Sequence, residues 1–259
     1  MPESHQVEMI QYNRGRFISM QDTIISESKL TIMINDYETS SFLCSWNEVE
    51  QLVIGNLFTE GWISSIEEIL SLEISEPDKL CKVYIPQTRF LEKNQDSFLS
   101  TGCGHKKQSS RPFSIAPREY TTFFISPAFV ISFMQKFQHA SPLFQTTGGV
   151  HSVALIPSEG DWILHEDIGR HNALDKAIGY GLQQSVIFSQ SCLATSGRIS
   201  SDMMMKVLPL PIPILISKSA ITDAAINLAL KAGITLVGFA RGERCNIYTY
   251  PERIKLSVP

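Results

Sequence analysis

The spacing of apolar and polar residues predicts that strands dominate the start of the chain. Residues 1–40 are expected to form short strands, and the clearest of them is the largely β-branched Leu30–Ile34. Asn35 and Asp36 follow this strand and are typical of a turn. Another strand is expected at Lys82–Pro86, where the proline ends the apolar run.

Two helices are expected between these strands. Apolar residues recur from Glu48 onward at the spacing of one helix face, and this helix is expected to end near Gly61. Ser45 is its predicted N-cap. The second helix, at Ser65–Leu70, is shorter. The apolar positions of the first helix are Val49, Leu52, Val53 and Leu57.

The middle of the chain has a different composition. Residues 91–118 are polar, contain Gly, Ser, Pro and cations, and show little periodicity, so we predict a long loop. Loops of this length inside compact chains are usually functional or disordered. After it, Pro127–Phe137 carries its aromatic and aliphatic residues on one face, which predicts a helix that packs against the core.

From about residue 145 the predicted strands and helices alternate, which indicates a sheet covered by helices. His151–Ile156 and Trp162–Glu166 are expected to pair as a hairpin. The other predicted strands are Ser185–Phe188, Ile212–Ser217, Thr235–Phe239 and Asn246–Tyr250. The predicted helices are Asn172–Leu182, Arg198–Val207 and Thr222–Lys231.

Composition and charge narrow the classes of protein. Of 259 residues, 43% are apolar and 19% are charged, as in a globular protein with a buried core. The net charge of -4 does not favour nucleic acid or an anionic membrane as a partner. The N-terminal segment lacks the apolar stretch of a signal peptide, and the apolar run Met203–Ile216 is too short to span a bilayer. We expect a cytoplasmic protein, and a homodimer is compatible with so small and nearly neutral a chain.

The five cysteines are scattered and form no C-x-x-C pair, which argues against a disulfide framework and against a structural zinc site. No metal site is predicted. The ordinary explanation for any one cysteine is a small buried apolar residue.

Cys103 differs from the other cysteines because it lies between Gly102 and Gly104 in the predicted loop. A free thiol with a pKa near 8.5 is only about 3% thiolate at pH 7, and nearby cations raise this fraction. This pattern favours a cysteine that takes up a sulfur atom and passes it on. The cations that follow it are His105, Lys106, Lys107 and Arg111.

Four further segments place glycine or charge near predicted strand ends, where backbone N–H groups and cations hold anions. Each also has an ordinary structural explanation. The pair Gly148-Gly149 before His151 suits a plain turn, and the charged start of His165–Lys176 suits a capped helix. Ser196 before Arg198 suits helix capping, and Gly238–Arg244 suits a surface hairpin.

Taken together, these segments resemble the FdhD/NarQ family. The matching stretches are TTGGVHSVAL, HEDIGRHNALDKAIG, SGRISSDMMMK and ISKSAITDAAINLALKAGITLVGFARGERCNIYTYPERI, in the order found in the family. The resemblance is strong over 145–254 and looser before, where it rests on the Gly61 region and the TGCG loop.

The resemblance implies a fold and a domain organisation. The fold is expected to be α/β, with a cytidine-deaminase-like three-layer sheet domain and a smaller N-terminal α+β domain. We place the N-terminal domain, which ends in the Cys103 loop, at residues 1–120 and the larger domain at residues 121–259.

The resemblance also implies an activity. Family members take sulfur from a cysteine desulfurase as a persulfide and transfer it to the molybdenum or tungsten bis-pterin guanine dinucleotide cofactor of formate dehydrogenase. The sulfur-carrying cysteine corresponds to Cys103. The cofactor-contacting loop corresponds to Phe239, Ala240, Arg241, Gly242, Glu243 and Arg244. We add His151, Arg170, His171 and Arg198 as candidate cofactor-binding residues.

One departure from the family concerns the cysteine loop, where many members have C-G-x-C. This chain has Lys106 in place of the second cysteine. A relay through a single cysteine therefore remains, while a mechanism with two local thiols does not.

Three other functions remain as alternatives. A cofactor-binding chaperone would use the same site without sulfur on Cys103. A zinc deaminase would need H-x-E and P-C-x-x-C segments, which are missing. A redox-sensing thiol protein would lack the second cysteine for a local disulfide.

Overall fold

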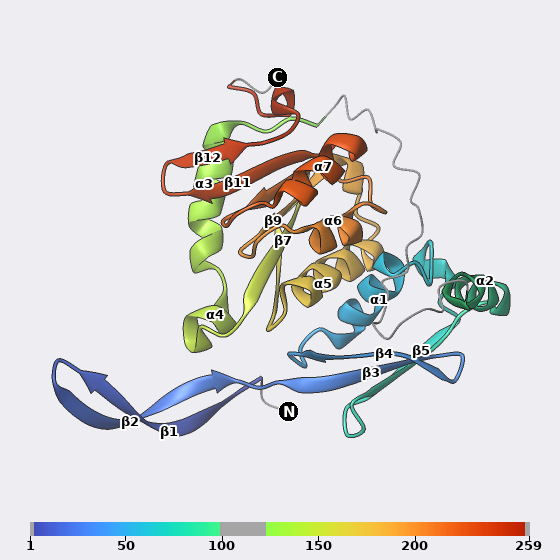
Figure 1. Cartoon of the computed structure of the whole chain (residues 1–259), viewed down its shortest axis with the longest axis horizontal. Helices are drawn as coiled ribbons and strands as arrows, with labels where there is room; N and C mark the ends of the chain where they lie inside the picture. Colours follow the sequence, from blue (N-terminus) through green and yellow to red (C-terminus); the bar gives the residue numbers. More distant parts are fainter. Residues whose placement is uncertain (1–2, 99–122, 257–259) are drawn as a thin grey trace.

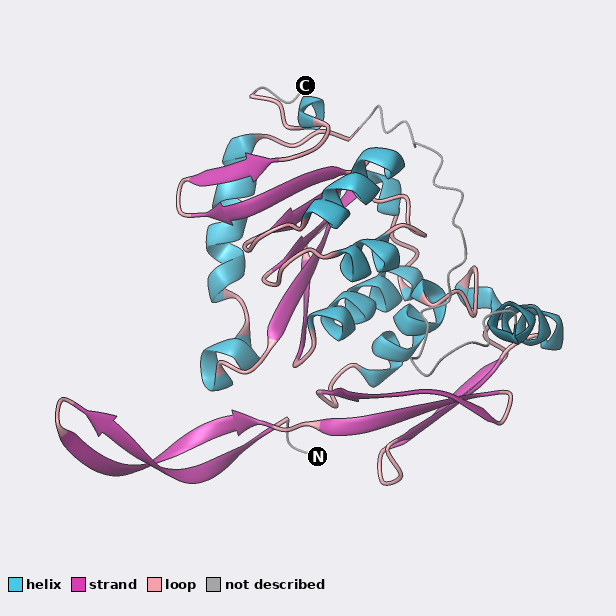
Figure 2. Ribbon diagram, in the orientation of Figure 1, coloured by secondary structure: helices cyan, strands magenta, loops and turns pink. Residues whose placement is uncertain are grey.

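The computed structural model describes residues 3–98 and 123–256, and these residues form three sheets (Figure 1). A two-stranded hairpin comes first, then a four-stranded sheet, and then a six-stranded sheet with helices on both faces (Figure 2). No helix within the described ranges is both long enough and apolar enough to cross a bilayer.

The first element, which we call the arm, is the antiparallel pair β1 (Ser4–Asn13) and β2 (Arg16–Ile25). Its turn residues Arg14 and Gly15 both have positive φ, 48° and 82°, as a tight two-residue hairpin requires. The arm projects away from the rest of the molecule (Figure 1). Strands were expected here, but their length was not.

The four-stranded sheet has the order β4-β3-β6-β5 and packs against helix α1 (Val49–Thr59). Alternate residues of the predicted strand around Leu30 are fully buried against this helix, and the predicted turn has positive φ at both Asn35 and Asp36. Both predictions are confirmed. The strands are β3 (Ser28–Ile34), β4 (Tyr37–Cys44), β5 (Ser71–Ser75) and β6 (Leu80–Tyr84).

Two predictions about this half are wrong. The N-cap of α1 is Glu48 in a left-handed conformation and not Ser45, because the Ser45 hydroxyl is used elsewhere, in a hydrogen bond to Asp167. Residues 91–98 belong to helix α2 (Gln87–Phe98) and not to a loop, because they contain good helix formers and neither Gly nor Pro. The rest of the predicted loop, residues 99–118, lies outside the described residues. The predicted short helix is the 3-10 turn Ile66–Glu68.

The six-stranded sheet has the order β12-β11-β10-β9-β7-β8. Its three central strands β9, β10 and β11 are parallel, and β7, β8 and β12 pair antiparallel with their neighbours. The strands are β7 (His151–Pro157), β8 (Ile163–Asp167), β9 (Ser191–Thr195), β10 (Ile214–Ser217), β11 (Thr235–Arg241) and β12 (Arg244–Ile247).

Helices cover both faces of this sheet, so the region has three layers. Val153 and Leu155 of β7 face one core, whereas the intervening Ala154 faces the other, on the side of α3. The predicted helix α3 is confirmed, with the Ser126 side chain accepting a hydrogen bond from Phe129 N. The helices are α3 (Pro127–His139), α4 (Pro142–Thr147), α5 (Arg170–Gln183), α6 (Ser201–Val207) and α7 (Asp223–Ala232). Short 3-10 turns occur at Phe188–Gln190 and Pro251–Arg253.

The predicted strand Ser185–Phe188 is wrong. Ser185 has a positive φ of 52° just after α5, and the strand begins only at Ser191. The apolar run Val186–Phe188 suggested a strand, but its Phe188 packs against α5 from a 3-10 turn, beside Gly181. The helix predicted at Arg198–Val207 begins later, at Ser201.

The two halves of the chain meet where α1 crosses α5 at very close range. A Cβ atom added to Gly55 would lie 1.8 Å from the carbonyl oxygen of Asp175, and one added to Gly179 would lie 1.9 Å from that of Gln51. Only glycine permits this approach. The predicted boundary between residues 1–120 and 121–259 falls among residues that the structure does not describe, and it stays a prediction.

Candidate functional site

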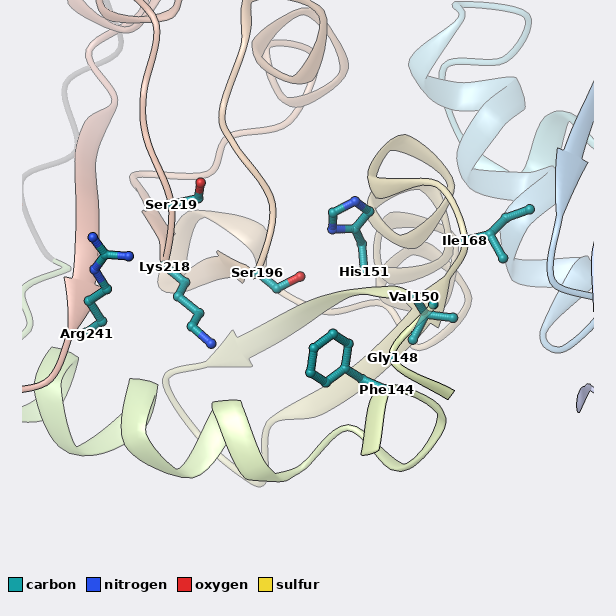
Figure 3. Close-up of a pocket in the computed structure, with 10 residues that line it drawn as sticks. Phe144, Gly148, Val150, His151, Ile168, Ser196, Lys218, Ser219 and Arg241 are labelled. Atoms are coloured by element: carbon teal, nitrogen blue, oxygen red, sulfur yellow. The ribbon is translucent and has the colours of Figure 1, made fainter. Parts of the chain in front are cut away.

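A hollow of about 430 Å³ opens at one edge of the six-stranded sheet (Figure 3). It lies at the carboxyl ends of the parallel strands, where open α/β sheets bind their ligands. The lining residues come from the loops after β8, β9 and β10, from the end of β11, from α4 and the turn after it, and from the start of β7. They are Phe144, Gly148, Gly149, Val150, His151, Ile168, Ser196, Lys218, Ser219 and Arg241.

Strand register brings these residues together. Thr195 ends β9 directly opposite Ser217, which ends β10, so the residues after both strands reach the same edge. Strand β7 runs antiparallel to β9, which places its first residue, His151, at this edge as well. His151 in turn pairs with Asp167 of β8, so Ile168 follows at the rim.

Hydroxyl groups at the strand ends fix the loops around the hollow. Thr195 Oγ1 accepts a hydrogen bond from Gly197 N at 3.1 Å, and Ser217 Oγ accepts one from Ser219 N at 2.9 Å. Ser217 Oγ also donates to the Gly197 carbonyl at 2.8 Å. These local bonds hold the two loops against each other, so that the wall of the hollow is pre-organised.

Among the described residues, the lining carries positive charge and no carboxylate. Lys218 is half-buried, and its ammonium makes no hydrogen bond or ion pair with any described residue. Arg241 lies at one side, its guanidinium carbon 5.5 Å from the centroid of the Phe239 ring. Figure 3 shows the side chains of Lys218, His151 and Phe144 around the same space. Two cations without carboxylate partners favour an anionic ligand.

Two histidines near the hollow are held neutral. Burial, with a contribution from Arg170, lowers the pKa of His151. Burial, followed by Arg170, lowers the pKa of His171 to about 4. His171 Nε2 is buried without a hydrogen-bond partner in the described part of the chain. Both imidazoles therefore offer one N–H donor and one acceptor nitrogen at neutral pH rather than a charge.

Arg170 supports the wall beside His151. A Cβ atom on Gly197 would lie 3.1 Å from Arg170 Cβ and 3.5 Å from His151 Nδ1, so these three residues are in close contact. Arg170 and His171 begin α5, and neither is among the lining residues. Both therefore lie outside the lining, and Arg170 contacts it through Gly197 and His151.

The predicted cofactor loop forms the β11–β12 hairpin. Phe239 has a positive φ of 49°, and its N–H donates to the Ser219 carbonyl at 3.0 Å, which joins the hairpin to the wall of the hollow. Ala240 is fully buried, and Gly242 turns the chain with a φ of 62°. Of the predicted loop only Arg241 lines the hollow. Glu243 and Arg244 are exposed on the hairpin, and Arg198 is exposed before α6.

The acidic residues of the EDIGRHNALDK segment build the scaffold. Glu166 accepts hydrogen bonds from Leu143 N and Phe144 N at 3.2 and 3.1 Å, which fixes α4 beside the hollow. Asp167 forms a fully buried ion pair with Lys176 at 2.8 Å and also accepts from Ser45 N and Oγ. The segment thus joins the N-terminal sheet to the wall of the site.

Sequence reasoning missed Lys218 and Ser219 as site residues. The available signal was position, because both directly follow the predicted strand Ile212–Ser217, and side chains after parallel strands meet at the ligand-binding edge. Phe144 was also missed, since α4 was not predicted.

The predicted sulfur-carrying residue, Cys103, lies outside the described residues. The other four cysteines are poor nucleophiles. Burial raises the pKa of Cys44, Cys81 and Cys192 to about 12, and burial also raises the pKa of Cys245. In the part of the chain that the structure describes, no three His, Cys, Asp or Glu side chains gather as metal ligands would.

Comparison with known proteins gives consistent results. The sequence pattern of the FdhD/NarQ family matches residues 25–255. Proteins named sulfur carrier protein FdhD are similar to the chain: one from Staphylococcus haemolyticus is 37% identical, and one from Staphylococcus aureus is 34% identical. The alignments cover 95% of this chain in both cases, and 95% and 94% of those proteins.

A solved structure agrees in fold. The crystal structure described as a formate dehydrogenase accessory protein from Desulfotalea psychrophila is 28% identical, with a TM-score of 0.79. The match covers 98% of this chain and 100% of that one. It supports the mixed α/β fold with several sheets. The predicted likeness to cytidine deaminases is not tested by it and stays a prediction.

Proposed function

Because the chain belongs to the FdhD/NarQ family, we propose that it is a sulfur carrier required for formate dehydrogenase activity. It takes sulfur from a cysteine desulfurase as a persulfide on Cys103. It then transfers this sulfur to the molybdenum or tungsten bis-pterin guanine dinucleotide cofactor, which is its substrate and not a resident group. Both steps take place in the cytoplasm.

The observation that carries this proposal is the cationic hollow at the carboxyl edge of the sheet. Each guanine dinucleotide arm of the substrate carries a diphosphate. The Lys218 ammonium has no partner among the described residues, Arg241 lies at one side of the same space, and no carboxylate of the described residues lines it. These two cations would hold a diphosphate by charge-assisted hydrogen bonds. His151, held neutral, would donate or accept one hydrogen bond beside them.

The other predicted contacts have supporting roles in this proposal. Arg170 packs against Gly197 and His151, and His171 follows it on α5 outside the lining. Phe239, Ala240 and Gly242 shape the hairpin that carries Arg241. Glu243, Arg244 and Arg198 are exposed outside the hollow, where they would meet parts of a large substrate that extend beyond it.

Sulfur uptake is a thiol exchange at Cys103. The Cys103 thiolate attacks the outer sulfur of the donor's persulfide, a new S–S bond forms, and the donor cysteine leaves as a thiolate. Among the cysteines of the chain, Cys103 alone stands between glycines with cations after it. The raised pKa values of the other four cysteines leave it as the best nucleophile.

Delivery of the sulfur breaks the S–S bond that uptake formed. The S–S bond of the Cys103 persulfide breaks, Cys103 returns as a thiolate, and the outer sulfur becomes a sulfide on the metal. Two electrons are required, and the metal of the reduced substrate supplies them as it rises from the +4 to the +6 state.

The three-layer arrangement around the six-stranded sheet supports the further proposal of a cytidine-deaminase-like domain. That likeness is one of architecture alone. The segments that bind zinc in deaminases are missing from the sequence.

Intact-protein mass spectrometry tests the sulfur-carrying role. The chain is incubated with a cysteine desulfurase and cysteine, and wild type is compared with Cys103→Ala. Wild type should gain the mass of one sulfur atom and the variant none. Cys245→Ala is the matched control, because Cys245 is only partly buried, and it should gain the same mass as wild type.

The alternative function is a cofactor-binding chaperone. It is favoured by one observation, that no cysteine in the described part of the chain lines the hollow. In that case Cys103→Ala would still bind guanosine diphosphate and would still support formate dehydrogenase activation. Loss of activation with binding intact would exclude it.

A further inference from the structure

The hollow has two chemically different walls. Lys218 and Arg241 belong to a polar wall, together with two serines. The other wall is apolar and is formed by Phe144, Val150 and Ile168 (Figure 3). An anion alone needs only the polar wall. The apolar wall indicates that the ligand also carries an apolar or aromatic group.

Phe144 is the large side chain of the apolar wall that stays exposed. Its side chain is 45% exposed, whereas Val150 beside it is 5% exposed. Phe144 belongs to none of the three hydrophobic core clusters that the described residues form. Figure 3 shows its ring turned toward the space that Lys218, Ser196 and His151 surround. The ring is therefore free to contact a ligand.

The backbone that carries Phe144 is fixed by a buried carboxylate. Glu166 is 6% exposed and accepts hydrogen bonds from Leu143 N and Phe144 N. It also accepts one from the Ser141 hydroxyl. At the other end of α4, Gly148 has a positive φ of 66°, and its N–H donates to the Phe144 carbonyl at 2.7 Å. A helix of six residues is not stable by itself, so these bonds hold the ring in place before a ligand binds.

A fixed phenyl ring beside two cations suits a ligand that joins a planar ring to phosphate. Nucleobases stack on aromatic side chains, because every base has a π face. Lys218 and Arg241 would hold the phosphates of the same molecule. The volume of about 430 Å³ lies within the range of sites that bind such small molecules.

We propose that Phe144 is the base-stacking residue of the hollow, with α4 as its platform. The inference rests on the proposed function, because it takes the ligand to be a guanine dinucleotide arm of the cofactor. It assigns the base of that arm to α4 and leaves the diphosphate to Lys218 and Arg241. Phe144 thus determines how much more tightly a nucleotide binds than diphosphate alone.

Calorimetry tests this inference with two probes on the purified full-length chain, guanosine diphosphate and inorganic pyrophosphate, which lacks the base. Wild type is compared with Phe144→Ala and with Phe144→Tyr, which keeps an aromatic ring. The matched control is Phe129→Ala, because Phe129 is 37% exposed on α3 and does not line the hollow. Thermal unfolding checks that each variant is folded.

Wild type should bind guanosine diphosphate at least tenfold more tightly than pyrophosphate. Phe144→Ala should bind guanosine diphosphate about tenfold more weakly, the size of one base–aromatic stack, and pyrophosphate as wild type does. Phe144→Tyr and the control should match wild type with both probes. Unchanged guanosine diphosphate affinity in Phe144→Ala would overturn the inference. An equal loss with both probes would also overturn it, because the ring would then only support the wall.

Lys218→Met separates this inference from the proposed function. If this variant binds both probes like wild type while Phe144→Ala still loses guanosine diphosphate alone, the base subsite stands and the proposed role of the cation fails. If wild type binds both probes equally well and Lys218→Met loses both, the cation holds the ligand and the base subsite fails. Wild type that binds neither probe would contradict both.

Discussion

At the scale of single residues, the candidate site is marked by two cations, Lys218 and Arg241, that have no carboxylate partner among the described residues. Lys218 follows Ser217 at the end of a central parallel strand, and its backbone N–H donates to the Thr195 carbonyl at 3.0 Å. The backbone is therefore fixed while the ammonium stays available. A buried or paired lysine could not hold an anion in this way.

Lys218→Met should weaken guanosine diphosphate binding about tenfold, or about 1.4 kcal/mol, because one charge-assisted contact is lost. Its thermal midpoint should match that of wild type, since the ammonium stabilises no described residue. Calorimetry and thermal unfolding measure the two quantities. Lys231→Met, on the exposed side of α7, is the control and should bind like wild type. Equal affinities for both variants would remove Lys218 from the site.

His171 should make stability depend on pH. The folded chain holds its pKa at about 4, below the ordinary value of 6.5, because burial and Arg170 disfavour the imidazolium. The unfolded chain therefore binds more protons between these pH values, and stability falls as pH decreases through this window. His171→Gln removes the group.

Urea unfolding at pH 7.5 and 4.5 checks this expectation. Wild type should lose more free energy of unfolding between the two pH values than His171→Gln loses. The arm variant His5→Gln, which changes an exposed histidine, should behave like wild type. Equal losses in wild type and His171→Gln would contradict the assignment.

At the scale of elements, the contact between α1 and α5 is set by glycines. Gly179→Ala would push a Cβ atom into the backbone of α1, 1.9 Å from the Gln51 oxygen. We expect a loss of about 1–3 kcal/mol, because the helices must separate. In a helix without such a contact, the same change raises the free energy of unfolding by about 0.5–1 kcal/mol. The sign of the measured change therefore shows whether the two helices are in close contact. Urea unfolding measures it, and a gain in stability would contradict the close crossing.

Much of the element order could be predicted from sequence, because periodicity follows burial. The strand Leu30–Ile34 alternates buried and partly buried residues, and the helix predicted at Thr222–Lys231 is α7, which Thr222 caps by accepting a hydrogen bond from Ala225 N. Strand β9 could not be located, because Ser191–Thr195 is buried on both faces and lacks an alternating pattern. The more apolar run just before it, Ser185–Phe188, was predicted as the strand instead.

The site was harder to predict than the fold. Arg241 and His151 were identified from motifs, whereas Lys218 was missed because its role depends on strand order, which no local pattern encodes. The acidic residues of EDIGRHNALDK suggested a ligand site, yet Asp167 and Asp175 are used in buried ion pairs with Lys176 and Lys206. Burial opposes the ammonium of Lys206, but Asp175 and Glu60 hold its pKa above the ordinary value.

At the scale of the whole molecule, buried charges join the two halves. The Lys176 ammonium contacts Asp167 at 2.8 Å and donates to the Ser45 carbonyl and to Asn47, which lie between the N-terminal sheet and α1. The Asp175 carboxylate likewise accepts from Asn56 and Thr59 of α1. These bonds cross the interface that helix packing creates, so the halves should unfold together.

Lys176→Met should lower the free energy of unfolding by about 3–5 kcal/mol, because Asp167 is left buried without its partner. Adding Asp167→Asn should recover part of the loss. Urea unfolding followed by circular dichroism and by fluorescence should give one coincident transition. Two separate transitions, one of them unaffected by Lys176→Met, would show that the halves are independent.

We propose that sulfur travels through Cys103 to the cofactor of formate dehydrogenase. The most direct measurement loads wild type and Cys103→Ser with ³⁵S from labelled cysteine and a cysteine desulfurase. Each protein is then mixed with formate dehydrogenase that lacks the sulfido ligand, and both the label on the cofactor and formate oxidation are measured. We expect label and activity with wild type, and neither with the variant. Activation by Cys103→Ser would contradict the account.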